Sequence, residues 1–195
     1  LLLKPYGTGA GGVAWTAADQ LDGAEKVLAA ALRFHDYGRE NPRERPVRKG
    51  RGWDEVRKPL FDRLREVRLL ALKNAMTVGD WNRARDLGRR LSAAYPKDSG
   101  VAAEVAKASV LEADRLLKSE DHRDHVSAKS LLDEFEGRYP GEGGEPLRLL
   151  RARIAEIARK AFQRAKDKEE VKDLPTAQAA LAQAADLDST IPGLR

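Results

Sequence analysis

The stretch Gly79-Asp80-Trp81-Asn82-Arg83-Ala84 separates two amphipathic segments and decides how the chain folds. Glycine readily ends a helix, and an aspartate directly after it can cap the next one. Upstream, apolar residues recur every three or four positions from Trp53 to about Val78, with Pro59 bending or restarting the first turn. Downstream, a helix capped by the aspartate runs to Tyr95, where Pro96 stops it. The stretch therefore predicts a helical hairpin.

The same periodicity and similar stop signals extend over most of the remaining chain. No segment alternates apolar and polar residues in the manner of a β-strand. Asp124 is the expected cap of a fifth helix, and Pro175 suits the first turn of a seventh. The sequence thus predicts an all-α protein of about seven helices. Besides the two of the hairpin, the predicted helices span 16–37, Ser99–Lys118, His125–Tyr139, a segment that begins near Glu145, and Pro175–Leu187.

Three segments share one spacing of small, apolar and terminating residues. They are Ala84-x3-Gly88-x2-Leu91-x4-Pro96, Ala128-x3-Leu132-x2-Phe135-x4-Pro140 and Ala177-x3-Leu181-x2-Ala184-x4-Ser189. This spacing resembles the second helix of a tetratricopeptide repeat (TPR), in which a small residue lets two helices approach and a proline ends the hairpin. The glycine-acidic-aromatic turn of that family stands only before Ala84, and Ser189 replaces the final proline. The resemblance covers roughly residues 58–192, with copies 44 and 49 residues apart instead of about 34.

The resemblance implies antiparallel helical hairpins stacked as a TPR-like right-handed α-solenoid. Each hairpin is too small to cover its own apolar face, so neighbouring hairpins bury a shared core. In this family the concave surface binds a peptide or a helix of another protein. The resemblance therefore implies a non-catalytic protein–protein interaction or scaffolding module without a cofactor. Candidate concave-face contacts lie on the first helix of each hairpin: Arg68, Lys73, Asn74, Lys107, Glu112, Arg115, Arg151, Arg153 and Arg159.

Charge and composition suggest how the chain is organised. Residues 1–100 carry a net charge of +7 and residues 101–195 a net charge of −2. A Gly-rich leader (1–15) and an N-terminal helix (16–37) precede a basic Pro/Gly/Arg loop (38–52), and a TPR-like domain (53–195) follows. The chain begins with Leu1, and a turn at Ile191-Pro192-Gly193 suggests a further helix. We therefore expect a fragment of a longer chain.

Two other hypotheses remain open beside the interaction module. One is a polyanion-binding module that uses the basic loop and the next basic helix: Arg43, Arg45, Arg48, Lys49, Arg51, Arg83, Arg85, Arg89 and Arg90. No aromatic residue stands among the arginines of the loop to stack on bases, so a solvated connector is favoured over a nucleic acid site. The other rests on a weaker resemblance of Trp15–Tyr37 and the closing Ala-rich segment to helical segments of large bacterial extracellular solute-binding proteins of peptide transporters. That resemblance implies an accessory module of an extracytoplasmic transport protein.

Motifs for catalysis or metal binding receive little support from their context. The absence of cysteine removes thiolate nucleophiles and zinc–cysteine sites. Residues Gly7–Gly12 satisfy G-x-G-x-x-G, but no second strand follows. Asp121–His125 has a metal-binding composition in what we expect to be a polar turn, and His35 lies near a helix end that favours a cation. We expect no enzyme, no bound metal and no membrane-spanning segment. Compartment and oligomeric state stay open.

Overall fold

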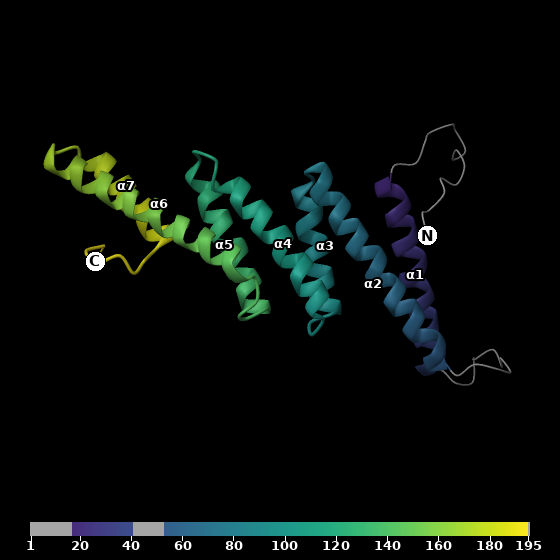
Figure 1. Ribbon diagram of the computed structural model, residues 1–195. Coiled ribbons are helices and arrows are strands. Elements are labelled where there is room, and N and C mark those ends of the chain that lie inside the picture. The colour runs from purple at the N-terminus through teal and green to yellow at the C-terminus, as the bar shows by residue number, and fades with distance from the viewer. Residues whose placement is uncertain (1–16, 41–52, 195) are drawn as a thin grey trace, which may run out of the picture. The chain divides into compact units, whose positions relative to one another are not determined.

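The described residues of the computed structural model, 17–40 and 53–194, form seven α-helices and no strand (Figure 1). In chain order they are α1 (Ala17–Glu40), α2 (Trp53–Val78), α3 (Trp81–Ala94), α4 (Ser99–Leu116), α5 (His122–Arg138), α6 (Gly144–Glu170) and α7 (Leu174–Leu187). The prediction of an all-helical chain with about seven helices is thus confirmed for this part of the protein. The Gly-rich leader and loop residues 41–52 lie outside the described residues.

Helix contacts divide the chain into two units, Leu1–Ala94 and Tyr95–Arg195. In the first unit, α2 packs against both α1 and α3. In the second unit, α4 pairs with α5 and α6 pairs with α7, while further contacts join the two pairs. Helices that follow one another after a short turn pack antiparallel as hairpins. Most of the contacts are therefore made between neighbours in sequence.

Leucine and alanine side chains fill the seams between these helices. Leu72, Leu91 and Leu132 are completely buried. The alanines that open the three similarly spaced segments, Ala84, Ala128 and Ala177, are also buried. Alanine adds only a methyl group to the backbone, so two helices can approach closely at these points and leucines can fill the remaining space. The spacing found in the sequence therefore marks buried contacts of α3, α5 and α7.

The turn between α2 and α3 is closed by two backbone hydrogen bonds around a left-handed residue. Gly79 has φ 74° and its N–H donates to the carbonyl of Met76 (3.3 Å). The next N–H, of Asp80, donates to the carbonyl of Ala75 (2.9 Å). This pair of bonds is the Schellman motif of helix C-termini. Asp80 then caps α3 as predicted, because its Oδ1 accepts the backbone N–H of Arg83 (3.1 Å).

The turn between α6 and α7 has the same pattern with lysine in place of glycine. Lys172 has φ 62°, and its N–H donates to the carbonyl of Glu169 (2.9 Å). The N–H of Asp173 donates to the carbonyl of Lys168 (2.9 Å), and Asp173 Oδ1 accepts the N–H of Thr176 (3.4 Å). Two hairpins, one in each unit, therefore turn by the same backbone geometry.

The start of α5 differs from the prediction. Asp121, not Asp124, is the N-cap, and its side chain accepts the backbone N–H of Arg123 (2.8 Å). The helix consequently begins at His122, three residues earlier than predicted. Asp124 lies in the first turn of α5, where a negative charge interacts favourably with the helix dipole. The side chain of Asp124 therefore stabilises the helix through its charge, although it is not the cap.

Replacing Gly79 by alanine tests the left-handed turn. We expect Gly79→Ala to lower the free energy of unfolding by about 1 kcal/mol, because an L side chain disfavours this conformation. Space is not limiting, since the nearest atom to an added Cβ is Trp81 Nε1 at 3.9 Å. Gly23→Ala, within α1 and with no atom within 4 Å of the added Cβ, is the control. It should raise the free energy of unfolding by about 0.5–1 kcal/mol. Urea denaturation measures both, and changes of equal sign would contradict the assignment.

Candidate functional site

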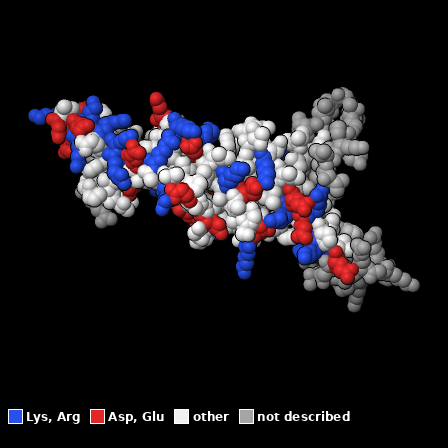
Figure 2. Space-filling model, in the orientation of Figure 1, with Lys and Arg blue, Asp and Glu red and all other residues white. Residues whose placement is uncertain are grey.

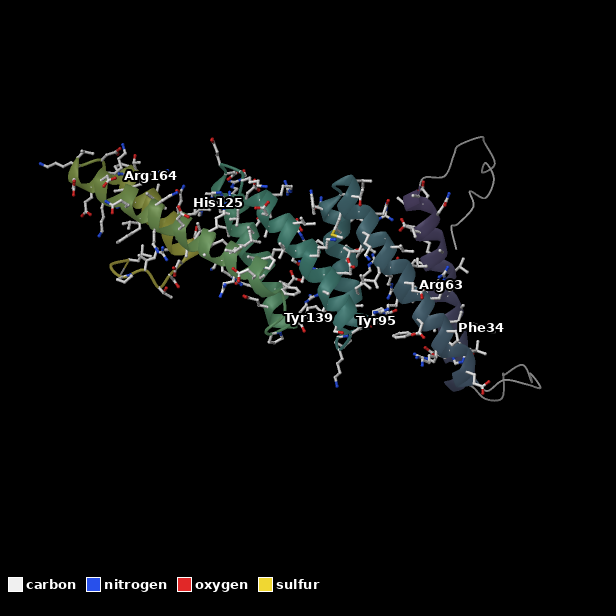
Figure 3. All side chains as sticks on the ribbon, in the orientation of Figure 1. Phe34, Arg63, Tyr95, His125, Tyr139 and Arg164 are labelled. Carbon is white, nitrogen blue, oxygen red and sulfur yellow. The ribbon has the colours of Figure 1, made fainter. Side chains whose placement is uncertain are left out.

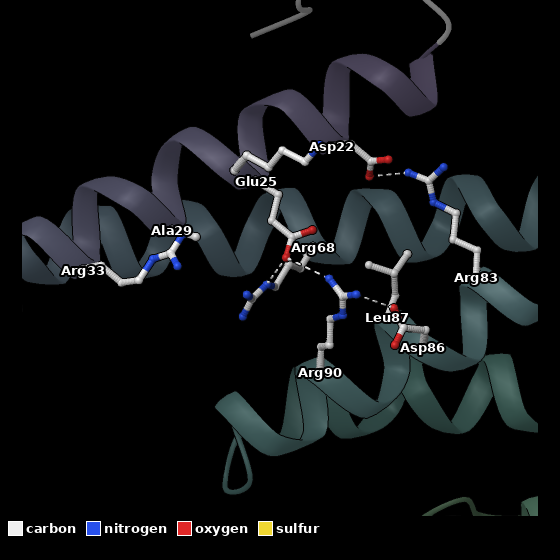
Figure 4. Close-up of a pocket in the computed structure, with 10 residues that line it drawn as sticks. Asp22, Glu25, Ala29, Arg33, Arg68, Arg83, Asp86, Leu87 and Arg90 are labelled. Carbon is white, nitrogen blue, oxygen red and sulfur yellow. Dashed lines mark hydrogen bonds and ion pairs between the residues drawn. The ribbon is translucent and has the colours of Figure 1, made fainter.

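Two grooves, one in each unit, are lined largely by charged side chains. The α1–α3 groove has a volume of about 620 Å³ and lies between α1 and α3, with Arg68 of α2 also lining it (Figure 4). The α6 groove has a volume of about 650 Å³ and is lined by residues after α4, His125 of α5 and one face of α6. Figure 2 shows basic and acidic side chains interspersed over the visible face of the described residues. Each of the two grooves is thus a hollow with charged side chains along its walls.

Ion pairs across the α1–α3 groove connect α1 to α3. Arg83 Nη2 donates to Asp22 Oδ1 (2.5 Å) and to the carbonyl of Ala18 (3.3 Å). Arg90 pairs with Asp86 on its own helix (2.8 Å) and lies 3.9 Å from Glu25 of α1. Two of the four arginines of α3 that were predicted to contact a polyanion are thus already paired with carboxylates.

Glu25 has the least exposed carboxylate of this groove and orients a side chain of α2. Its Oε1 accepts Nε–H of Arg68 at 2.9 Å, and the two side chains are only 12% and 16% exposed. Among the described residues, Nη1 and Nη2 of Arg68 donate no hydrogen bond. The terminal nitrogens of a largely buried guanidinium are therefore left for whatever enters the groove.

Two further cations of α1 line the same groove. Lys26 and Arg33 are exposed and lie seven residues apart on one helix face, with Ala29 between them. Neither side chain has a hydrogen bond or an ion pair with another described residue. The groove is lined by five basic side chains and three carboxylates, the latter being Asp22, Glu25 and Asp86. The charged side chains of the groove that have no partner are therefore positive.

The far end of α1 is attached to α2 by a separate ion pair. Arg57 Nε donates to Asp36 Oδ1 (2.8 Å), and Arg57 Nη2 donates to Asp36 Oδ2 (3.3 Å). The hydrogen bonds from Arg57 hold the pKa of Asp36 below its usual value, against the opposing effect of desolvation. His35, which is buried, contacts the same carboxylate at 3.3 Å. Both ends of α1 are therefore joined to the rest of the unit through ionic contacts.

The α6 groove presents a stripe of residues along one helix face. Arg153, Ile157, Lys160 and Arg164 follow one another at spacings of four, three and four residues. Arg153 is held by Asp114 Oδ1 (3.2 Å) and by the carbonyl of Leu117 (3.1 Å).

The remaining cations of the stripe are less constrained. Lys160 pairs with Glu156 (2.7 Å), and its hydrogen bond lowers the pKa of that exposed carboxyl. Arg164 has no partner within residues 17–40 and 53–194. Figure 3 labels Arg164 on α6 and His125 on α5, whose Nε2 lies 2.8 Å from the carbonyl of Ser119. Along α6, the stripe thus presents one cation, then an apolar side chain, then two further cations.

The candidate concave-face residues are distributed over several environments. Arg68 and Arg153 line the two grooves. Glu112 is only 2% exposed, so it lies in the core of the second unit. Arg151 is paired with Glu136 and with Asp133 (2.6 Å), and these hydrogen bonds raise its pKa although burial opposes the rise. The others line neither groove: Lys73, Asn74, Lys107, Arg115 and Arg159.

The candidate polyanion contacts are only partly described. Arg83 and Arg90 line the α1–α3 groove, whereas Arg85 and Arg89 of the same helix do not. The loop residues lie outside the described residues: Arg43, Arg45, Arg48, Lys49 and Arg51. Sequence reasoning missed Lys26, Arg33, Lys160 and Arg164. The helical spacing of these residues places them on one face of α1 or of α6. It does not show which of the cations have no carboxylate partner.

The two histidines of the Asp121–His125 segment point to different partners. His122 Nε2 lies 3.0 Å from Asp186 Oδ2 of α7, whereas His125 contacts the carbonyl of Ser119. Within the described part of the chain, no three His, Asp or Glu side chains are grouped as metal ligands. In the same residues, no helix combines the length and apolar character needed to cross a membrane.

Comparison of the chain with protein-family models, with curated proteins and with solved structures found no match. The function proposed below therefore rests on the chemistry of the two grooves and on the helical hairpins that position them.

Removing the negative charge of Glu25 tests the ionic network of the α1–α3 groove. We expect Glu25→Gln to lower the free energy of unfolding by about 1–2 kcal/mol, because Arg68 then stays largely buried without a counter-charge. Glu66→Gln, which breaks the exposed pair with Arg63 (2.6 Å), should cost less than about 0.5 kcal/mol.

A second variant separates the charge from the packing. Adding Arg68→Met to Glu25→Gln should recover part of the lost stability, because no largely buried guanidinium then remains without a counter-charge. Urea denaturation compares the variants. A single Glu25→Gln variant as stable as Glu66→Gln would show that the network contributes little.

Proposed function

We propose that this chain is a non-catalytic, TPR-like interaction module that binds an extended acidic segment of another protein. The helical hairpins support this proposal. Those of α2–α3 and α6–α7 turn through equivalent hydrogen bonds, and buried alanines recur at matching positions in α3, α5 and α7. In such arrays the first helices of the hairpins commonly provide the binding surface, and α6 is the first helix of its hairpin.

The stripe on α6 is the observation that carries the proposal. Arg153, Ile157 and Lys160 line one groove together with Arg164, so three cations and one apolar side chain face the same hollow. Two carboxylates, of Glu120 and Glu156, also line it, which leaves the cations in excess by one. Because a helix rises 1.5 Å per residue, Arg153 and Ile157 are separated by about 6 Å along the axis. Lys160 and Arg164 follow at about 10 and 16 Å from Arg153. The stripe can therefore contact several side chains of one elongated ligand.

An extended peptide fits these intervals. Alternate side chains of an extended strand project to the same face about 6.6 Å apart. A peptide lying along α6 with the pattern acidic-x-apolar-x-acidic would place its first carboxylate at Arg153 and its apolar side chain at Ile157. Its second carboxylate, about 13 Å from the first, would lie between Lys160 and Arg164. Charge and spacing thus both favour an acidic extended segment.

The groove can accept such a ligand without disrupting the fold. The Lys160–Glu156 pair is exposed and lies within one helix, and pairs of this kind contribute little to stability. A ligand carboxylate can replace Glu156 at little cost. Arg153 keeps its contacts with Asp114 and Leu117, which fix its position. One end of the stripe is therefore rigid and the other is free to adapt.

Binding of a model peptide tests this function. We expect a fluorescein-labelled Gly-Glu-Ser-Leu-Ser-Glu-Gly peptide to bind the full chain, and the same peptide with lysines for glutamates not to bind. Reversing two charges of the stripe, with Lys160→Glu and Arg164→Glu together, should weaken binding of the acidic peptide at least tenfold. Fluorescence anisotropy measures the affinity, and circular dichroism verifies that the helices persist.

Arg159→Glu is the matched control, because Arg159 is an exposed cation of α6 that does not line the groove. It should leave the affinity within about twofold of the unmodified chain, since a charge outside the contact is largely screened. Equal losses in Arg159→Glu and in the stripe variant would overturn the assignment of the groove. Equal affinity for the acidic and basic peptides would overturn the proposed ligand class.

A further inference from the structure

The α1–α3 groove has a positive charge that its own carboxylates do not neutralise. Arg83 is paired with Asp22, Arg90 with Asp86, and Arg68 with Glu25. These three pairs account for every carboxylate that lines the groove. Lys26 and Arg33 then remain without an acidic partner among the described residues. The groove therefore has a surplus of two positive charges.

Hydrogen-bond donors without a described protein acceptor line this groove. Glu25 engages Nε of Arg68, which leaves Nη1 and Nη2 without a protein acceptor in the described residues. Figure 4 shows Arg68 and Arg33 extending toward the same part of the groove, beside Ala29. Lys26 lines the same wall of α1. Because Arg68 is only 16% exposed, water solvates its guanidinium incompletely, and an anion there would gain more than at an open surface.

Small and apolar side chains leave room for such an anion. Ala29 stands between Lys26 and Arg33 on the helix face, so no long side chain fills the space between the two cations. Leu87 of α3 also lines the groove but is only 3% exposed. The volume of about 620 Å³ is much larger than a single inorganic anion needs. The ligand that fits is an anionic group attached to a larger organic body.

We propose that the α1–α3 groove binds a phosphate monoester, with its phosphoryl group held by Arg33 and Arg68 and with Lys26 adding to the positive charge of the wall. A phosphate monoester carries a charge of about −1.5 to −2 at neutral pH and has three strong acceptor oxygens. Its charge therefore matches the surplus of the groove. Its tetrahedral oxygens can accept from donors that approach from two helices, whereas a carboxylate offers two oxygens in one plane.

Glu25 acts as a positioning residue in this site. By accepting Nε–H of Arg68 it fixes the guanidinium plane and leaves the two Nη groups for the phosphoryl oxygens. Its charge is offset by Arg68 and by the more distant Arg90, at 3.9 Å. The site is separate from the α6 groove, since the two grooves share no residue and belong to different units. It therefore adds a second ligand class to the proposed peptide binding.

Titration of the full chain with phenyl phosphate, followed by calorimetry, tests the proposal. We expect saturable binding of one equivalent, with inorganic phosphate binding more weakly because it lacks the organic body. Lys26→Ala and Arg33→Ala together should weaken phenyl phosphate binding at least tenfold. Lys58→Ala and Arg63→Ala together, which remove two exposed cations of α2 outside the groove, should leave it within about twofold.

Further measurements give outcomes that support or overturn the site. Benzoate has a similar body with a single negative charge, and it should bind at least tenfold more weakly than phenyl phosphate. Equal binding of benzoate, or equal losses in the two pairs of variants, would overturn the proposal. The stripe variant of α6 should bind phenyl phosphate normally, which keeps this test independent of the peptide test.

The source of the phosphoryl group is distinguished by two more ligands. A phosphoserine-containing peptide that binds more tightly than phenyl phosphate, and loses affinity on dephosphorylation, would indicate a modified protein. A sugar phosphate that binds more tightly than the phosphopeptide would indicate a small metabolite. Failure of all these phosphate monoesters to bind would overturn the site.

Discussion

The rest of the structure depends on the burial of a one-sided seam of leucine and alanine between neighbouring antiparallel helices. Leu72, Leu91 and Leu132 are completely buried, as are small residues such as Ala75 and Ala158. Each helix commits one stripe of its surface to this seam, and burying it is the main favourable contribution to folding. Most charged residues consequently lie on the other faces, with Glu112 in the core as an exception. Charged side chains outside the seams line the two grooves that form the candidate sites.

The helix ends show which features of the fold can be predicted from sequence. Glycine followed by aspartate at 79–80 fixes the end of α2 and the start of α3 through local hydrogen bonds, so those boundaries follow from a few adjacent residues. The start of α5 was misplaced because Asp121 and Asp124 have the same capping chemistry three residues apart. Which of them caps the helix depends on where the chain leaves α4. Sequence periodicity alone does not contain that information.

The sites were less predictable than the helices because their chemistry depends on pairing between distant residues. Arg68 and Arg153 could be assigned to first helices of hairpins, but Glu25 and Asp114, which orient them, come from other helices. Lys26 becomes notable only when the arginines of α3 are seen to be neutralised by their own partners. The number of charged residues can be counted in the sequence. Which of them have no partner of opposite charge depends on the fold.

The shared turn of α2–α3 and α6–α7 also has a consequence for recognising related hairpins. A sequence search based on glycine finds the turn at Gly79 and misses the one at Lys172, although both adopt the left-handed conformation. Aspartate followed four residues later by alanine occurs in both, at Asp98 and Ala102 where α4 begins, and at Asp124 and Ala128, where the helix starts one turn earlier. The register of the buried alanine is thus kept while the helix start shifts. A profile anchored on Asp-x3-Ala would match the turn at Lys172 that a glycine-centred pattern overlooks, and it would also match the start of α4.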